Sequence, residues 1–240
     1  MAIDEVLLSS RVPILRFYQW EPAAVSIGRY QDLNEIDMEY CADNNIDVVR
    51  RITGGKAVLH EKELTYSFII DKEMMPRSII ESYKIISSAI IQGLRTLGLN
   101  PEMNKSKREN KGNPVCFQEP SINELTINEK KFVGSAQVRK KGKLLQHGSI
   151  LTGINTEKHS SCFKIKPEAD DLRKRITYID VSENELKSAI KQGFSGYFNT
   201  CIKERSLCSR ELSEVFGGFR GQVSTFNKSP QKINLKIPPI

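Results

Sequence analysis

The sequence lacks the features of several classes of protein. No apolar run approaches the ~18 residues that a membrane helix needs. The opening residues, MAIDEVLLSSRV, show neither the basic region nor the long apolar stretch of a secretory signal. The five cysteines are odd in number and scattered, without the CxxC pairs of zinc sites. We therefore expect a cytoplasmic protein without a disulfide framework, a structural metal or a membrane partner.

Internal repeats and low-complexity segments are also absent before the C-terminal tail. The 240 residues, 39% hydrophobic and 27% charged, have an ordinary globular composition and suit one large domain. From residue 217 to residue 240, Gly, Pro, Ser and Lys mix without helical or strand periodicity. We predict a catalytic domain over residues 1–216 and an irregular tail over residues 217–240 that packs weakly or not at all.

The charge of the chain is positive, with 36 Lys and Arg against 29 Asp and Glu, a formal net charge of +7. Such a balance permits a nucleic acid or an acidic protein as partner. The basic residues are not interleaved with aromatic residues, as stacking on nucleic-acid bases would require. The pattern favours an acidic protein and predicts no nucleic-acid partner.

Three capping signals predict helices that begin near Asp32, Ser78 and Ser182, because each places a side-chain oxygen three residues before a glutamate. After Ser78, apolar residues recur every three or four positions as far as Leu94, and Gly98 supplies a left-handed stop.

Runs rich in β-branched or aromatic residues predict strands, and the last three are separated by short turns. The predicted strands cover residues 25–28, 48–51, 64–70, 124–127, 131–138 and 144–151. Consecutive hairpins with helices elsewhere predict an α+β fold, with a mixed, mainly antiparallel sheet packed against helices.

Residues 50–60, RRITGGKAVLH, place two arginines, two glycines and a lysine after a predicted strand. Glycines permit close approach and positive φ, and amides beside a guanidinium suit a phosphate or carbonyl oxygen. The spacing is not that of a Walker A loop. On this pattern alone, a ligand-binding loop and an ordinary glycine turn with a solvated basic flank both remain open.

Cys116 lies between two prolines, just after the basic segment 104–113. Cationic surroundings lower a thiol pKa and raise the thiolate fraction, which predicts a nucleophile. A small buried apolar residue is the alternative reading, and it stays open. The other cysteines lack such surroundings and are interpreted as structural.

Gly134, Ser135 and Ala136 are small residues in succession and predict a groove on the sheet where a ligand approaches. Lys131 stands at the entrance of the same strand, where an ordinary surface lysine is the alternative. His60 and His147 lack metal-ligand spacing, so we predict no metal site.

Together these segments resemble the lipoate and biotin protein ligases and their octanoyltransferase relatives. The resemblance runs from Met1 to about Cys201. Its motifs occur in order at residues 50–60, 63–67, 131–137 and 145–150. Residues 115–121, VCFQEPS, are most similar to the cysteine-dependent octanoyltransferase branch of Gram-positive bacteria.

The resemblance implies the fold of the biotin and lipoate protein ligase catalytic domain. It also implies that Cys116 accepts the acyl group and that Lys131 lowers the pKa of this cysteine. The implied substrate site comprises Arg51, Gly54, Gly55, His60, Gly134, Ser135, Ala136, Gln137 and His147.

The implied reaction moves octanoyl from octanoyl-acyl carrier protein through a Cys116 thioester to a lysine of a lipoyl-accepting domain. The acceptor is the glycine-cleavage H protein or the E2 component of a 2-oxoacid dehydrogenase, and the step begins lipoate biosynthesis. A positive surface favours the encounter with an acidic carrier protein. No cofactor is expected, because the thioester is already activated.

Three alternatives remain open. An ATP-dependent lipoate–protein ligase shares the arginine–glycine motif and the lysine, and Cys116 would then be incidental. An octanoyl amidotransferase between lipoyl domains is a nearer alternative, and a non-catalytic binder of acyl-carrier or lipoyl domains is a third. We also expect relatives to carry about one more strand's worth of residues before Met1 and a different ending after Leu207.

Overall fold

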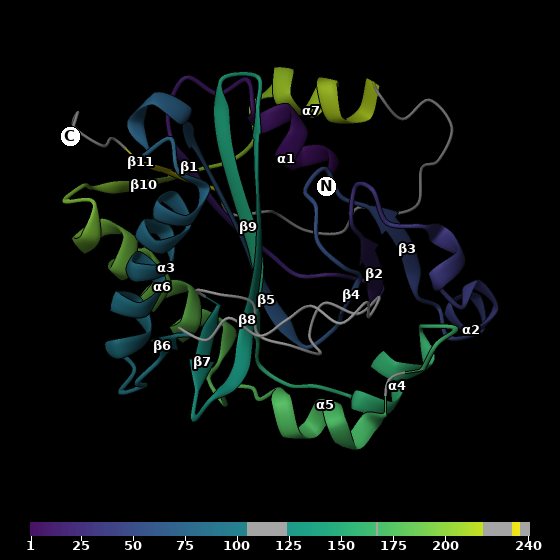
Figure 1. Ribbon diagram of the computed structural model, residues 1–240. Helices are drawn as coiled ribbons and strands as arrows, with labels where there is room; N and C mark the ends of the chain where they lie inside the picture. Colours follow the sequence, from purple (N-terminus) through teal and green to yellow (C-terminus); the bar gives the residue numbers. More distant parts are fainter. Residues whose placement is uncertain (105–123, 167, 218–231, 236–240) are drawn as a thin grey trace.

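The computed structural model describes residues 1–104, 124–166, 168–217 and 232–235, which form two β-sheets flanked by helices (Figure 1). The strands are β1 Ile14–Tyr18, β2 Ala24–Ile27, β3 Asp47–Arg50, β4 Val58–His60, β5 Glu63–Asp71, β6 Glu102–Met103, β7 Leu125–Ile127, β8 Lys130–Lys140, β9 Lys143–Leu151, β10 Ile202–Arg205 and β11 Lys232–Leu235. The helices are α1 Ala2–Leu7, α2 Met38–Asp43, α3 Ile79–Arg95, α4 Thr156–Ser161, α5 Ala169–Arg175, α6 Glu183–Tyr197 and α7 Ser209–Gly217, with 3₁₀ turns at Leu33–Glu35 and Lys72–Met74.

The larger sheet has eight strands in the order β10-β11-β1-β5-β9-β8-β7-β6, and all neighbours are antiparallel. The smaller sheet has the order β3-β2-β4, in which β2 runs parallel to β3 and antiparallel to β4. The predicted α+β class with a mainly antiparallel sheet is confirmed. Within the described residues, no helix is both long and apolar enough to span a membrane.

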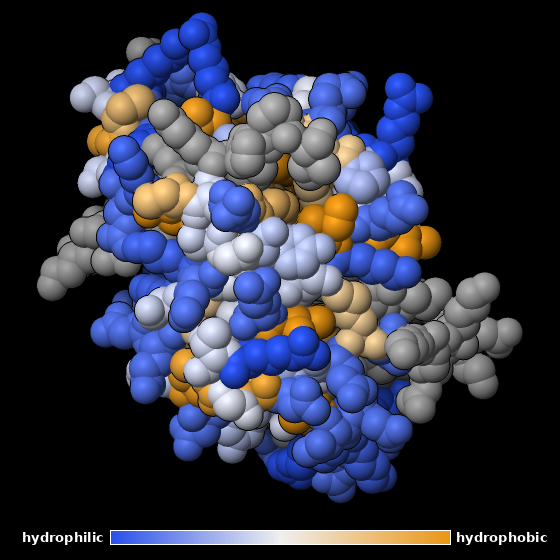
Figure 2. Space-filling model, turned by 90° about the vertical axis from the view of Figure 1, so that its left-hand side faces the viewer, coloured by the Kyte–Doolittle hydropathy of each residue, from blue (hydrophilic) through white to orange (hydrophobic). Residues whose placement is uncertain are grey.

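Helices α3 and α6 cover one face of the larger sheet and enclose the main core (Figure 1). Their predicted starts are confirmed, since Ser78 and Ser182 each accept a hydrogen bond from the backbone N–H three residues on. Ile86, Ile90 and Leu94 are fully buried, as the periodicity predicted. Figure 2 shows the outer surface on this side, where mostly hydrophilic side chains surround smaller apolar patches. The helices therefore turn their apolar stripes inward.

The helix predicted to begin at Asp32 is present only as a short 3₁₀ turn. Asp32 accepts a hydrogen bond from the backbone N–H of Asn34 and caps only the 3₁₀ turn Leu33–Glu35. The next residue, Ile36, is fully buried and forms an antiparallel bridge with Phe163, and this contact holds it in an extended conformation. The α-helix begins after Asp37 instead, where α2 includes Cys41.

The hairpins formed by β7, β8 and β9 are confirmed. Their turns use positive φ at Asn128 and Glu129, and at Lys141 and Gly142. The last hairpin pairs β8 with β9 from Val133↔Ile150 to Lys140↔Lys143. These long strands carry the small residues of the predicted groove into the middle of the sheet.

The irregular tail predicted over residues 217–240 is corrected in its described part. Residues 232–235 form β11, which lies between β1 and β10 and pairs with both (Figure 1). Gly217 is the last residue of α7. Four residues are too few to show strand periodicity, and two flanking strands supply the backbone hydrogen bonds that hold them.

Candidate active site

A cavity of about 170 Å³ opens between the two sheets and reaches α3. It is lined by Met1, Tyr18, Ser26, Arg51, Gly55, Val58, His60, Thr65, Tyr83, Glu124, Gly134, Ser135, Ala136, His147, Gly148 and Ser149. Seven of the predicted substrate residues belong to this lining: Arg51, Gly55, His60, Gly134, Ser135, Ala136 and His147. The segments that the sequence placed far apart therefore meet at one hollow.

Gly134 and Gly148 line this hollow where β8 and β9 pair. A Cβ at Gly148 would lie 2.5 Å from the Gly134 carbonyl oxygen and 2.9 Å from Cε1 of Tyr66. Gly148 pairs with Ser135 across β8 and β9, and Gly134 pairs with Ser149. The small residues predicted to form a groove line the cavity, and a side chain at Gly148 would require its neighbours to shift.

Arg51 organises the glycine loop that follows β3. Its guanidinium donates to the carbonyl oxygens of Ser26 at 2.8 Å, Gly54 at 2.9 Å and Lys56 at 2.7 Å. Gly55 has φ +90°, a conformation that favours glycine. Gly54 itself is not among the lining residues and contributes its carbonyl to this arginine. Arg51 therefore shapes the wall of the cavity by tying three backbone segments together.

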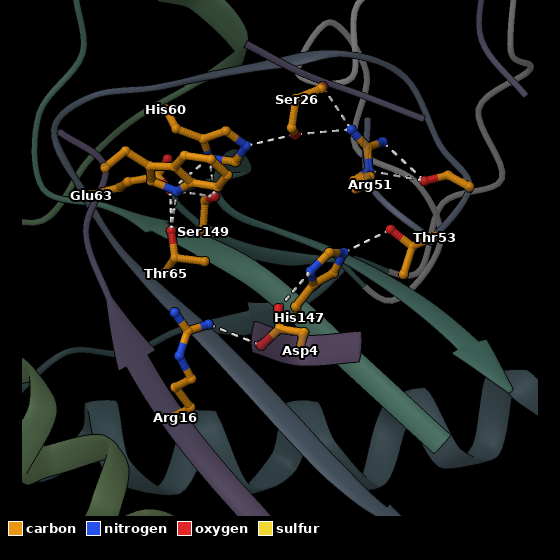
Figure 3. Close-up of polar contacts among 12 residues, drawn as sticks. Asp4, Arg16, Ser26, Arg51, Thr53, His60, Glu63, Thr65, His147 and Ser149 are labelled. Atoms are coloured by element: carbon orange, nitrogen blue, oxygen red, sulfur yellow. Dashed lines mark hydrogen bonds and ion pairs between the residues drawn. The ribbon is translucent and has the colours of Figure 1, made fainter. Parts of the chain in front are cut away.

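His60 is the centre of a buried polar cluster at one end of the cavity (Figure 3). Its Nε2 lies 2.7 Å from Ser26 Oγ and its Nδ1 lies 2.7 Å from Glu63 Oε1. The hydroxyls of Thr65 and Ser149 also donate to that same oxygen of Glu63, at 2.5 and 2.7 Å. The cluster fixes the position and orientation of the ring.

His147 is held in a similar way near the same cavity (Figure 3). Its Nε2 lies 2.7 Å from Thr53 Oγ1, and its Nδ1 lies 3.9 Å from the carboxylate of Asp4. Burial lowers the pKa of His147. Burial alone would raise the pKa of Asp4, but Arg16, 2.9 Å away, and His147 lower it below its ordinary value.

The polar floor of the cavity continues into the main core. The hydroxyls of Tyr66 and Ser135 lie 2.7 Å apart, and the Gln146 amide donates to Tyr66 Oη at 2.9 Å. Gln137, a predicted substrate residue, is not among the lining residues, and its amide donates to Gln146 Oε1 at 3.0 Å. Burial raises the pKa of Tyr66 to about 12, so the phenol stays neutral.

Lys131 is completely buried, and its Nζ donates to Glu124 Oε1 at 2.7 Å. Glu124 lines the cavity, whereas Lys131 is not itself among the lining residues. A surface lysine is thus the wrong reading. Cys116 lies outside the described residues, as does the predicted basic segment from residue 105 onward.

Sequence reasoning missed the acids that hold the two histidines. Asp4, Arg16 and Glu63 are all buried, with at most 4% of each residue exposed. The available signal was a charged residue inside an apolar strand, such as Arg16 in the run ILRFY of β1. A charge that is buried needs a partner, but the sequence does not show which acid supplies it. Within the described ranges, no cluster of His, Cys, Asp and Glu could hold a metal ion.

The antiparallel sheet with its cavity and buried lysine has the fold of lipoate–protein ligase catalytic domains, to which it is similar in solved structures. The sequence matches the lipoyl protein ligase A/B catalytic domain over residues 1–195, and the chain belongs to that family. The family predicted from the motifs is confirmed.

Similar proteins include octanoyltransferases named LipM. The chain is 42% identical to that of Clostridioides difficile, with 90% of this chain and 88% of the relative covered. It is 37% identical to that of Bacillus subtilis, with 90% and 87% covered. Among solved structures, a lipoate protein ligase from T. acidophilum with bound lipoic acid is 27% identical, with a TM-score of 0.77 over 90% of this chain and 86% of that one. A lipoate-protein ligase A bound with ATP is 28% identical, with a TM-score of 0.76 and the same coverage.

Proposed function

We propose that this chain is an octanoyltransferase of lipoate biosynthesis. Its donor is octanoyl-acyl carrier protein, its acceptor is a lysine of the glycine-cleavage H protein or of an E2 lipoyl domain, and it acts in the cytoplasm. The observation that carries the proposal is the identity of 37–42% to octanoyltransferases, against 27–28% to the lipoate ligases of the same fold.

The proposed nucleophile is the Cys116 thiolate. It attacks the thioester carbonyl of the donor, a new C–S bond forms, and the pantetheine sulfur leaves with its electron pair and takes up a proton. The acceptor nitrogen then attacks the acyl-enzyme carbonyl, and the Cys116 sulfur leaves in turn. Both steps exchange an already activated acyl group, so the route consumes no ATP.

Lys131 is the cation that we assign to the thiolate. A neighbouring ammonium favours an ionised thiol. The ion pair with Glu124 at 2.7 Å supports the charged form of this lysine in a fully buried position. The small residues Gly134 and Ala136 leave room in the cavity for the acyl chain and its carbonyl.

Intact mass measurement tests the proposed intermediate. Incubation with octanoyl-acyl carrier protein, without ATP, is expected to add one octanoyl group that hydroxylamine removes. Cys116→Ser abolishes the adduct, because an alcohol is not ionised at neutral pH. Cys208→Ser, at an exposed cysteine of the same chain, is the matched control and retains it. An adduct that persists in Cys116→Ser, or none in the wild type, contradicts the proposal.

A further inference from the structure

The cavity holds a serine, a histidine and a glutamate in series. Ser26 Oγ lies 2.7 Å from His60 Nε2, and His60 Nδ1 lies 2.7 Å from Glu63 Oε1 (Figure 3). All three residues are buried, and both Ser26 and His60 line the cavity. An imidazole held by a carboxylate on one nitrogen, with a hydroxyl on the other, is an arrangement that moves protons.

The hydrogen bonds define which nitrogen carries the proton. Three donors converge on Glu63 Oε1, from Thr65, Ser149 and His60, as suits an ionised carboxylate. An ionised carboxylate only accepts, so His60 Nδ1 carries a proton, and Nε2 is the acceptor when the ring is neutral. Arg51 donates to Ser26 Oγ at 3.1 Å, which leaves the serine hydrogen directed at Nε2.

The imidazole is also locked in place. Trp20 stacks on His60 with 4.4 Å between ring centroids and 15° between planes. The indole N–H donates to Thr65 Oγ1 at 2.9 Å, which ties the tryptophan to the same cluster. An aromatic face also favours a cation beside it, so the stacking stabilises the imidazolium that proton uptake creates.

Amide formation requires a base that the buried lysine does not provide. A lysine acceptor is an ammonium ion at neutral pH and must lose a proton before its nitrogen can attack. Lys131 lies 2.7 Å from the Glu124 carboxylate, and such pairing favours the ammonium form, which is a poor base. His60 offers another site for the proton, because its Nε2 lies 2.7 Å from the hydroxyl oxygen of Ser26 at the cavity wall.

We propose that Ser26, His60 and Glu63 form a proton relay that deprotonates the acceptor lysine, an inference that rests on the proposed acyl transfer. The ammonium gives one proton to Ser26 Oγ, whose own proton passes to His60 Nε2. The nitrogen then bonds to the thioester carbonyl carbon, the C–S bond breaks, and the departing thiolate takes the second proton. The imidazolium afterwards releases its proton to solvent.

Single-turnover kinetics separate this role from a structural one. In His60→Gln and Glu63→Gln, transfer of the octanoyl group to the acceptor lysine at neutral pH is expected to slow by about 10²-fold more than formation of the adduct does. The deficit narrows as pH rises, because more acceptor amine is uncharged. Hydroxylamine is uncharged at neutral pH and needs no base, so it is expected to remove the octanoyl group equally fast from the wild type and from both variants. The titratable or charged groups near His60 are Glu63, Arg51 and His159, and they are the ones that can affect the pH dependence.

Ser26→Thr retains a hydroxyl and is expected to recover transfer that Ser26→Ala loses. The relay is wrong if both Gln variants transfer at the wild-type rate, or if the deficit is the same at every pH and equally large with hydroxylamine. Should His60→Gln fail to fold, Glu63→Gln carries the test alone. A wild type that forms no adduct but still octanoylates the acceptor contradicts the Cys116 intermediate instead, and the pH signature of the relay can still be measured on that direct transfer.

Discussion

At the scale of single residues, two buried histidines organise the cavity, each between a hydroxyl and a carboxylate. His60 lies between Ser26 and Glu63, and His147 lies between Thr53 and Asp4. The two clusters differ in strength, since the carboxylate lies 2.7 Å from the first ring and 3.9 Å from the second. The tighter pair supports the proton transfer that we assign to His60.

A third histidine, His159, makes the stability of the fold depend on pH. Burial, and then the charge of His60, lower its pKa from 6.5 to about 4. The unfolded chain therefore binds a proton more readily than the folded one, so stability is complete above pH 6.5 and falls as pH drops towards 4. At ~1.4 kcal/mol per pKa unit, the loss is about 3 kcal/mol.

His159→Phe retains a ring beside Phe163 and removes this titration. Urea unfolding at pH 7 and pH 4 is expected to show a pH-dependent loss about 3 kcal/mol smaller in the variant than in the wild type. Asp4 and His147 are present in both the wild type and His159→Phe, so their contributions to the pH-dependent loss of stability cancel when the two proteins are compared. Ser160→Ala, the adjacent position on α4, should retain the wild-type difference. Equal pH dependence in wild type and His159→Phe would show that His159 does not carry it.

At the scale of elements, α3 and α6 meet at glycines. A Cβ on Gly193 would lie 2.3 Å from the Ala89 carbonyl oxygen and 2.4 Å from the Gly93 nitrogen. Both atoms belong to the backbone, so they cannot move away by a change of rotamer. Gly196, one turn later on α6, faces only the flexible end of Gln92. The two glycines are therefore a matched pair for testing the helix contact.

Gly193→Ala is expected to lower the free energy of unfolding by about 1–3 kcal/mol, because it forces the helices apart. Gly196→Ala should leave it unchanged or raise it by up to ~1 kcal/mol, since alanine is the better helix former. Chemical denaturation of both variants provides the measurement. Similar values for the two substitutions would mean that the helices do not touch at Gly193.

Helices with a capping residue and a clear apolar periodicity could be predicted from the sequence, whereas short elements without such local signals could not. Ser78 and Ser182 cap their helices as the sequence indicates, because the capping bond is made within three residues. Asp32 carries the same signal, yet contact between Ile36 and Phe163 overrides it. Short elements such as α1, β4 and β11 depend on neighbours that are distant in sequence.

At the scale of the whole molecule, the cavity depends on both sheets. His60 and Ser26 come from the smaller sheet, whereas Glu63 and Ser149 come from the larger one. The motifs indicated that residues 50–60, 63–67, 131–137 and 145–150 belong together, but only the fold pairs Glu63 with His60 and Asp4 with His147. The sequence therefore predicts the members of the site better than their pairing.

We expect this protein to transfer an activated octanoyl group and not to activate a free acid. The decisive measurement follows the mass of a lipoyl-accepting domain incubated with the protein and one donor at a time. Octanoyl-acyl carrier protein without ATP is expected to octanoylate the acceptor lysine, and free octanoate with ATP is expected to leave it unmodified. Modification only with free octanoate and ATP would instead identify the protein as a ligase.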